Sequence, residues 1–115
     1  MIYMNKKKIE PKFGSIFKAV EEKAKKVSFL QDTATQITLN GNLDNLPLYV
    51  KVEDGVAEVA PYEYINAPFY IDADAGTFAS VLSGDKDFVV AIAQGSVTIN
   101  GDAAQAVVFC KTMFG

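Results

Sequence analysis

The sequence contains no histidine, no arginine and no tryptophan, and its only cysteine is Cys110. One cysteine excludes a disulfide within the chain, and the usual zinc sites need several His or Cys ligands, so we expect no metal and no cofactor. Without arginine the chain lacks the bidentate fork that commonly reads guanine or clamps phosphate. Nucleic acid is therefore not an expected partner.

Long apolar runs are also missing. No stretch supplies the ~18 apolar residues of a membrane span, and Met1 to Lys8 lacks the apolar segment of a signal peptide. The last residues, Met113 to Gly115, do not match a Ser-Lys-Leu peroxisomal address. A lone thiol in an apolar helix suits a reducing compartment, so the sequence predicts a cytoplasmic protein with no spanning segment.

What is present is an ordinary globular composition with an uneven charge distribution. The 115 residues are 50% hydrophobic and 22% charged, which predicts one packed domain. Residues 1–26 hold eight lysines and three glutamates, whereas the remainder holds three lysines and eleven acidic residues. We interpret residues 1–12 as a basic arm and residues 13–115 as a single domain. Lys6, Lys7 and Lys8 are either a solvated terminus or a transient contact with anionic lipid.

The hydrophobic spacing predicts an α+β fold. From Phe13 to Val27 the apolar residues recur every three or four positions, as on one face of an amphipathic helix. The spacing then changes to alternation, which indicates strands around 37–39, 48–53, 56–59, 69–71 and 97–99. Asp54-Gly55 is typical of a type I′ turn, because both of its central positions need positive φ.

The second half adds three shorter helices. Asp74 is predicted to cap a helix that Gly84 ends. A second helix is expected from Lys86 to Gln94, and its unbroken apolar run predicts burial on more than one side. The turn Gly101-Asp102 is expected to open a last helix that runs to about residue 114.

The last helix has more apolar surface than one sheet contact needs. One stripe would suffice to pack it on a sheet: Ala103, Ala106, Val107, Cys110, Met113 and Phe114. Ala104, Val108 and Phe109 extend the apolar surface around the helix. The surplus implies a second apolar contact, which could be a ligand cavity, a partner chain or the neighbouring helix.

The order of motifs from Phe69 onward resembles the sterol carrier protein type 2 family. The shared features are a helix ending Leu82-Ser83-Gly84, a helix ending in Gln94-Gly95, the alternating strand 96–99, and Gly101-Asp102 before an Ala-rich terminal helix. They cover about 45 residues at matching spacing. The first half agrees in the order of its elements, although the family's usual early Trp has no counterpart.

The resemblance implies a fold and a ligand. The fold is a single mixed, mainly antiparallel five-stranded sheet covered by helices, with an apolar tunnel that accepts sterols, fatty acyl chains or similar lipids. The ligand would be bound, and in some cases transferred, without catalysis by a monomer or weak homodimer. The resemblance implies candidate ligand-binding residues at matching positions of this sequence. Those in the lining are Phe78, Leu82, Phe88, Ile92, Phe109 and Met113, and Gln94 is a candidate headgroup contact.

Two other functions stay open. A cofactor-free acid/base enzyme could use Asp72, Asp74, Tyr70 and Tyr64 beside an apolar pocket, although Asp74 already has a capping role. An accessory interaction module would use the surplus apolar face of the C-terminal helices to cover a partner or a second copy. The module predicts concentration-dependent association, whereas a carrier predicts a monomer with internal volume.

Overall fold

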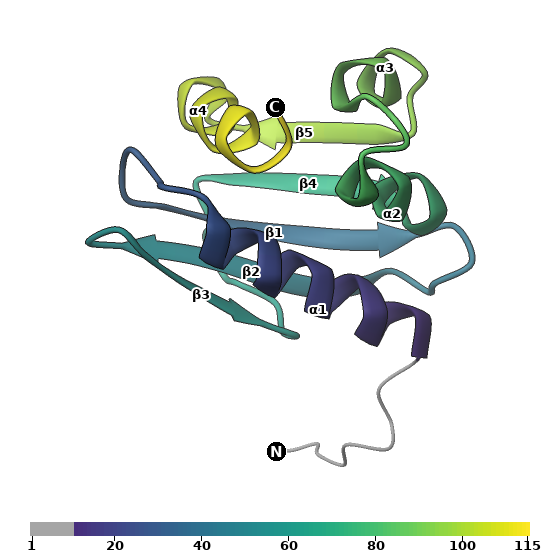
Figure 1. The fold of residues 1–115 in the computed structure, drawn as a ribbon, viewed down its shortest axis with the longest axis horizontal. Helices are drawn as coiled ribbons and strands as arrows, with labels where there is room; N and C mark the ends of the chain where they lie inside the picture. Colours follow the sequence, from purple (N-terminus) through teal and green to yellow (C-terminus); the bar gives the residue numbers. More distant parts are fainter. Residues whose placement is uncertain (1–10) are drawn as a thin grey trace.

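The computed structural model describes residues 11–115, which form an α+β domain (Figure 1). Its elements are α1 Pro11–Lys26, β1 Thr33–Asn40, β2 Leu46–Glu53, β3 Val56–Ala60, β4 Phe69–Asp74, α2 Ala75–Ser83, α3 Phe88–Ala93, β5 Val97–Gly101 and α4 Ala103–Phe114. Lys6, Lys7 and Lys8, with the lipid contact predicted for them, lie outside the described residues. Helix α1 begins at Pro11, two residues before the predicted start.

The five strands form one mixed sheet in the order β3-β2-β1-β4-β5. β1 pairs with β4 in parallel, and the other neighbouring strands pair antiparallel. This confirms the predicted single, mainly antiparallel five-stranded sheet. Asp54 and Gly55 both have positive φ, 53° and 80°, so the turn between β2 and β3 has the expected backbone.

Only one face of the sheet carries the core. Leu48, Ile37 and Ile71 are register partners on β2, β1 and β4, and all three are fully buried. The next row, formed by Tyr49 and its neighbours on β1 and β4, is only partly buried. Because successive side chains of a strand point to opposite faces, the helices must lie on the side of Ile37.

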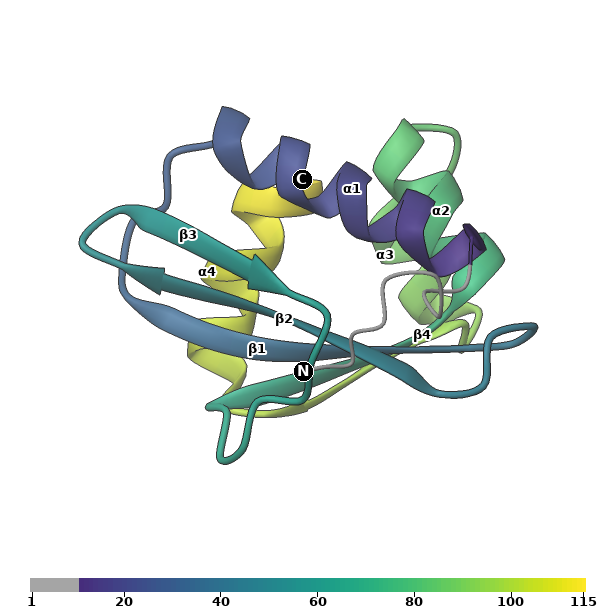
Figure 2. The same ribbon diagram turned by 90° about the horizontal axis from the view of Figure 1, so that it is seen from below.

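The helices occupy that side. Figure 2 shows α1, α2 and α3 together on one side of the sheet, with α4 rising from the β5 edge toward the same side. α1 turns its predicted apolar face inward, burying Phe13, Ile16, Val20 and Ala24. Within residues 11–115, no helix combines the length and the apolar character that crossing a bilayer requires.

Helix α2 begins and ends as the sequence predicts. The Asp74 carboxylate accepts hydrogen bonds from the Thr77 backbone N–H at 3.0 Å and from the Thr77 hydroxyl at 3.1 Å. Gly84 ends the helix in the left-handed conformation, with φ 87°. The carboxylate is therefore occupied as an N-cap.

Helix α3 differs from its prediction in both length and burial. It begins at Phe88 instead of Lys86, because the Asp87 carboxylate caps it by accepting from the N–H groups of Val89 and Val90. Only Phe88 and Ala91 are buried. The prediction that its apolar run is buried on more than one side is wrong, because α3 packs beside α2 and β5 and leaves its remaining side chains in solvent.

Helix α4 is rotated from its predicted orientation. Its buried residues are Ala106, Phe109, Cys110 and Met113. Val107, which was assigned to the sheet-facing stripe, is exposed, whereas Phe109 is central to the core. The Phe109 ring fills the large space between Phe29 and Phe69, with ring centroids at 5.8 and 5.6 Å. Filling that space sets the rotation of the helix.

Gly101 allows the chain to pass from β5 into α4. Its φ is 115°, and a Cβ built there would lie 2.6 Å from the Pro68 carbonyl oxygen and 2.7 Å from the Phe69 Cα. The next N–H, that of Asp102, donates to the same Pro68 oxygen at 2.9 Å. A side chain at residue 101 would therefore displace the start of α4 from the sheet edge.

We expect Gly101→Ala to lower the free energy of unfolding by about 1–3 kcal/mol, because it combines backbone strain with a clash against backbone atoms. Gly76→Ala is the matched control, since its Cβ would make only an ordinary 3.5 Å contact with Asp74. The control should leave stability unchanged or raise it by about 0.5–1 kcal/mol. Urea unfolding measures both, and equal stabilities would contradict this role of Gly101.

Candidate functional site

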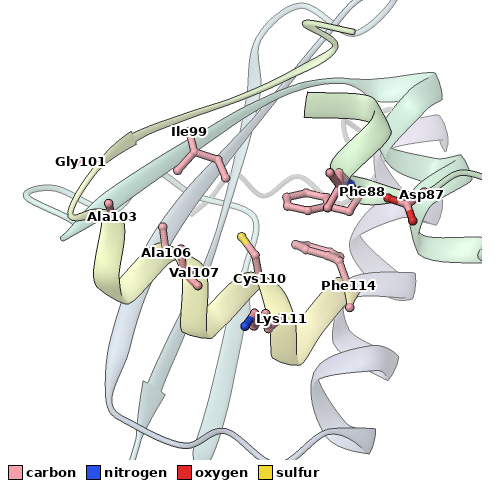
Figure 3. A pocket seen from close by; sticks show the side chains of 12 residues that line it. Asp87, Phe88, Ile99, Gly101, Ala103, Ala106, Val107, Cys110, Lys111 and Phe114 are labelled. Atoms are coloured by element: carbon pink, nitrogen blue, oxygen red, sulfur yellow. Dashed lines mark hydrogen bonds between the residues drawn. The ribbon is translucent and has the colours of Figure 1, made fainter. Parts of the chain in front are cut away.

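A cavity of about 590 Å³ lies between α3, β5 and α4. Figure 3 shows the side chains that surround it. The lining residues are Asp87, Phe88, Val89, Ile99, Gly101, Ala103, Ala106, Val107, Cys110, Lys111, Phe114 and Gly115. Most of them are apolar, and the volume falls in the range of small-molecule sites.

The two ends of the cavity differ in shape. At one end the rings of Phe88 and Phe114 stack with their centroids 4.7 Å apart, and they close the cavity between α3 and α4. At the other end the lining is small, with Gly101, Ala103 and Ala106 around the Ile99 side chain. Because Gly101, Ala103 and Ala106 have little or no side chain, the region between β5 and α4 is left unfilled.

Helix α4 presents two adjacent faces. One packs on the sheet through Phe109 and Met113, and the other faces the cavity through Val107 and Phe114. Ala106 and Cys110 lie between the two faces, because they are buried and also line the cavity. The wall of the cavity therefore comes from the stripe predicted to face the sheet, whereas none of the surplus residues Ala104, Val108 and Phe109 lines it.

Cys110 is a buried residue of the wall. Its sulfur points into the cavity between the Phe88 end and the Ala106 end (Figure 3). Burial raises the pKa of the Cys110 thiol to about 12, because the apolar surroundings disfavour the charged thiolate. At neutral pH the group is therefore an uncharged, weakly polar part of the wall.

Two charged residues belong to the lining. The Asp87 carboxylate is held by the N–H groups of Val89 and Val90 and serves as the N-cap of α3. The ammonium group of Lys111 forms no ion pair with any residue in the described part of the chain. Among the residues that the structure describes, Lys111 is thus the one cation in the lining.

The residues predicted as ligand contacts do not come together in one place. Phe88 lines the cavity, whereas Phe78, Phe109 and Met113 are fully buried in the core behind it. Leu82 lines a smaller hollow of about 170 Å³ between α1 and α2.

Ile92 and Gln94 do not line the cavity. Ile92 is exposed on α3, and the Gln94 side-chain oxygen accepts a hydrogen bond from Lys86 Nζ at 3.0 Å. Gln94 ends α3 as its C-cap.

Sequence reasoning missed most of the wall on α4. The signal was present, because Ala103, Ala106, Val107, Cys110 and Phe114 form one stripe at helical spacing. The sequence places this stripe on the sheet; Ala106 and Cys110 are buried as predicted, but Phe109 instead of Val107 packs on the sheet. The wall from β5, Ile99 and Gly101, had no separate sequence signal, since alternation alone does not identify which strand borders a cavity.

The acid/base candidates lie away from this cavity. Tyr70 and Asp72 alternate with the buried Ile71, so they face the uncovered side of the sheet. The Tyr70 hydroxyl accepts a hydrogen bond from the Ala67 N–H at 3.1 Å. Tyr64 packs against Tyr49, with ring centroids at 5.1 Å. These groups and the capping Asp74 are not assembled around one pocket.

A family model described as the SCP-2 sterol transfer family matches residues 13–113. No curated protein matches the chain in sequence. Sterol carrier protein 2 like 2 from Aedes aegypti superimposes with a TM-score of 0.73 at 10% identity, over 87% of this chain and 94% of that chain. The palmitated form of the same protein, solved in solution, superimposes with a TM-score of 0.71 at 10% identity, over 88% of this chain and 93% of that chain.

The same fold occurs inside a larger enzyme. A double mutant of the sec-alkyl sulfatase PisA1, an enzyme from Pseudomonas sp., superimposes with a TM-score of 0.70 at 15% identity over 93% of this chain. The match covers only 17% of the sulfatase chain. At such identities the similarities establish the fold.

We expect Cys110 to react slowly with a thiol reagent in the folded protein. With a pKa of about 12, only roughly one molecule in ten thousand carries the thiolate at pH 8. The labelling rate should rise about tenfold per pH unit up to the pKa. Absorbance with a disulfide reagent measures the rate, and the same chain in denaturant is the control. Rapid complete labelling of the folded protein at pH 8 would contradict the burial.

Proposed function

The chain belongs to the SCP-2 sterol transfer family, and from this premise we propose that it binds a lipid-like apolar molecule in the cavity between α3, β5 and α4. The single observation that carries the proposal is the cavity itself, about 590 Å³ in volume and lined mainly by apolar side chains. The protein acts as a carrier that holds its ligand by burial.

The energetics favour a ligand with a long hydrocarbon part. Burial of each methylene contributes about 0.8 kcal/mol, so six to eight methylenes gain about 5–6 kcal/mol before the costs of association. The stacked Phe88 and Phe114 rings offer an apolar end, and Lys111 offers a cation for a polar head. The palmitated form of the Aedes aegypti protein supports an acyl chain as ligand.

The ligand site proposed here is a cavity beside α4. Phe78, Phe109 and Met113 fill the interior between the sheet and the helices, and all three are fully buried. A ligand placed there would have to displace core side chains, whereas the α3–β5–α4 cavity is already formed. We therefore assign Phe78, Phe109 and Met113 to support of the wall and Phe88 to direct contact.

We propose carriage without catalysis. The Cys110 thiol has a pKa of about 12, which disfavours the thiolate needed for nucleophilic attack. Asp87 is occupied as a helix cap, and the acid/base candidates of the sequence lie elsewhere. The activity of the sulfatase belongs to a chain of which this fold is a small part. A monomer in the cytoplasm fits this role and the buried free thiol.

Filling the cavity should weaken the binding of a fluorescent fatty acid such as cis-parinaric acid. Ala106→Phe adds a ring to the middle of the wall, and Ala103→Phe adds one at the small end, where residue 103 is exposed. We expect at least a tenfold loss of affinity in a fluorescence titration. Circular dichroism verifies the fold, and Ala103→Phe keeps the test valid if Ala106→Phe unfolds.

Ala79→Phe is the matched control, because it adds the same ring to the smaller hollow that contains Leu82. Unchanged affinity is expected. If Ala79→Phe weakens binding while folded Ala103→Phe and Ala106→Phe do not, the ligand site is between α1 and α2 instead.

Native mass spectrometry of the purified chain tests the ligand class. We expect a discrete added mass that denaturing extraction releases as a lipid. If the wild-type protein carries no lipid and also does not bind cis-parinaric acid, the proposed carrier function is wrong.

A further inference from the structure

A pair of stacked rings closes one end of the cavity. Phe88 and Phe114 lie with their ring centroids 4.7 Å apart and with 22° between the ring planes, and both side chains line the cavity (Figure 3). Phe88 belongs to α3 and Phe114 to α4, so the pair bridges the two helices that border the cavity. We call Phe88 and Phe114 the aromatic stop.

The core supports the aromatic stop from behind. The Phe114 ring also meets the rings of Phe78 and Phe109 edge-on, with centroids at 5.5 and 6.4 Å. Phe78 and Phe109 are fully buried and do not line the cavity. Because these two rings are closely packed, Phe114 cannot retreat into the core without displacing them. A ligand that reaches the aromatic stop therefore meets a rigid wall.

The opposite end of the cavity lacks such a wall. Gly101 and Ala103, where β5 passes into α4, line the cavity there and are exposed. At the aromatic stop, by contrast, Phe88 is buried and Phe114 is partly buried. The hydrocarbon tail of an amphiphile gains most by contacting the two rings, and its polar group keeps its hydration at the exposed end. The terminal methyl group of the tail is therefore directed toward the aromatic stop.

Helix α4 gives the length of the wall. It runs from Ala103 at the exposed end to Phe114 at the aromatic stop, which is about 16 Å between the two Cα atoms at a rise of about 1.5 Å per residue. An extended hydrocarbon advances about 1.25 Å per carbon–carbon bond, so about twelve carbons fit beside the helix once the Phe114 ring is allowed for. Further carbons would have no wall to contact.

We infer that the aromatic stop limits how much of a hydrocarbon chain the cavity covers, and that Phe114 thereby selects single acyl chains of about twelve carbons. The inference rests on the proposed carrier function. Each methylene that is buried short of the aromatic stop raises the affinity, whereas a methylene added to a longer chain stays in water and adds nothing. The affinity therefore rises with chain length and then becomes constant.

Phe114→Ala tests this role, because it removes the ring that ends the cavity. Phe114 lies in the last turn of α4 and is only partly buried, so the variant keeps the buried contacts of Phe109 and Met113. Phe114→Leu is a second variant that loses less packing. The matched control is Phe17→Ala, since Phe17 is a partly buried ring of α1 that stacks on Phe13 at 6.3 Å and does not line the cavity.

Each protein is titrated calorimetrically with saturated fatty acids of about eight to sixteen carbons, below their micelle concentrations, and circular dichroism verifies the fold. For the wild type we expect the affinity to rise up to about fourfold per methylene until about twelve carbons and then to stay constant. In Phe114→Ala the rise should continue for about two to four more carbons, because the vacated ring volume joins the cavity. Phe114→Leu should extend the rise less, and Phe17→Ala should keep the wild-type profile.

Three results would overturn the inference. A wild-type affinity that keeps rising through the longest acid would mean that the chain passes the aromatic stop, and this result needs no variant to fold. The wild-type profile in folded Phe114→Ala and Phe114→Leu would place the limit elsewhere. An equal extension in Phe17→Ala would attribute it to general loosening of the core. If the wild type binds no fatty acid of any length, the carrier function itself has failed, which is a different outcome from the other three.

Discussion

The packing of Phe109 is the contact on which the arrangement of the C-terminal half depends. Its ring lies between Phe29, which follows α1, and Phe69 at the start of β4, and it also meets Phe114 at 6.4 Å. This one side chain joins α4 to the loop after α1 and to the sheet. Once Phe109 is buried, the helical period directs Val107 and Phe114 away from the sheet, and a cavity wall results. The position of the cavity is thus a consequence of core packing.

The alternation of apolar residues and the turn residues were sufficient to predict the sheet and most helix ends. Local chemistry determines the conformation of the turn and cap residues Asp54, Gly55, Asp74 and Gly84. These positions can therefore be identified from the sequence alone. Helix α3 was harder to predict. Its run Phe88–Ala93 is uniformly apolar, which usually indicates burial, and only the docking of α3 at the edge of the sheet leaves those side chains in solvent. Tertiary position overrides composition there.

The candidate site was predictable only in part, for a related reason. Phe88 was identified, and the surplus apolar surface of the last helix was recognised as a second contact. Which stripe faces the sheet depends on the relative size of side chains at neighbouring positions. The larger Phe109 is buried against the sheet, whereas Val107 is exposed. The spacing of apolar residues cannot rank these two, because both stripes have the same period. Volume, rather than hydrophobicity, decides between them.

Within residues 11–115, all the lining residues of the cavity come from one continuous stretch of chain, residues 87–115. The three strands β1, β2 and β3, with α1, contribute none of them. Substitutions at exposed lining positions such as Val89 and Val107 can therefore change the wall and leave the pairing of β1, β2 and β3 intact. A lineage could exchange one ligand for another by altering a short terminal portion of the gene, with the scaffold retained. The fold is in this sense well suited to diversification.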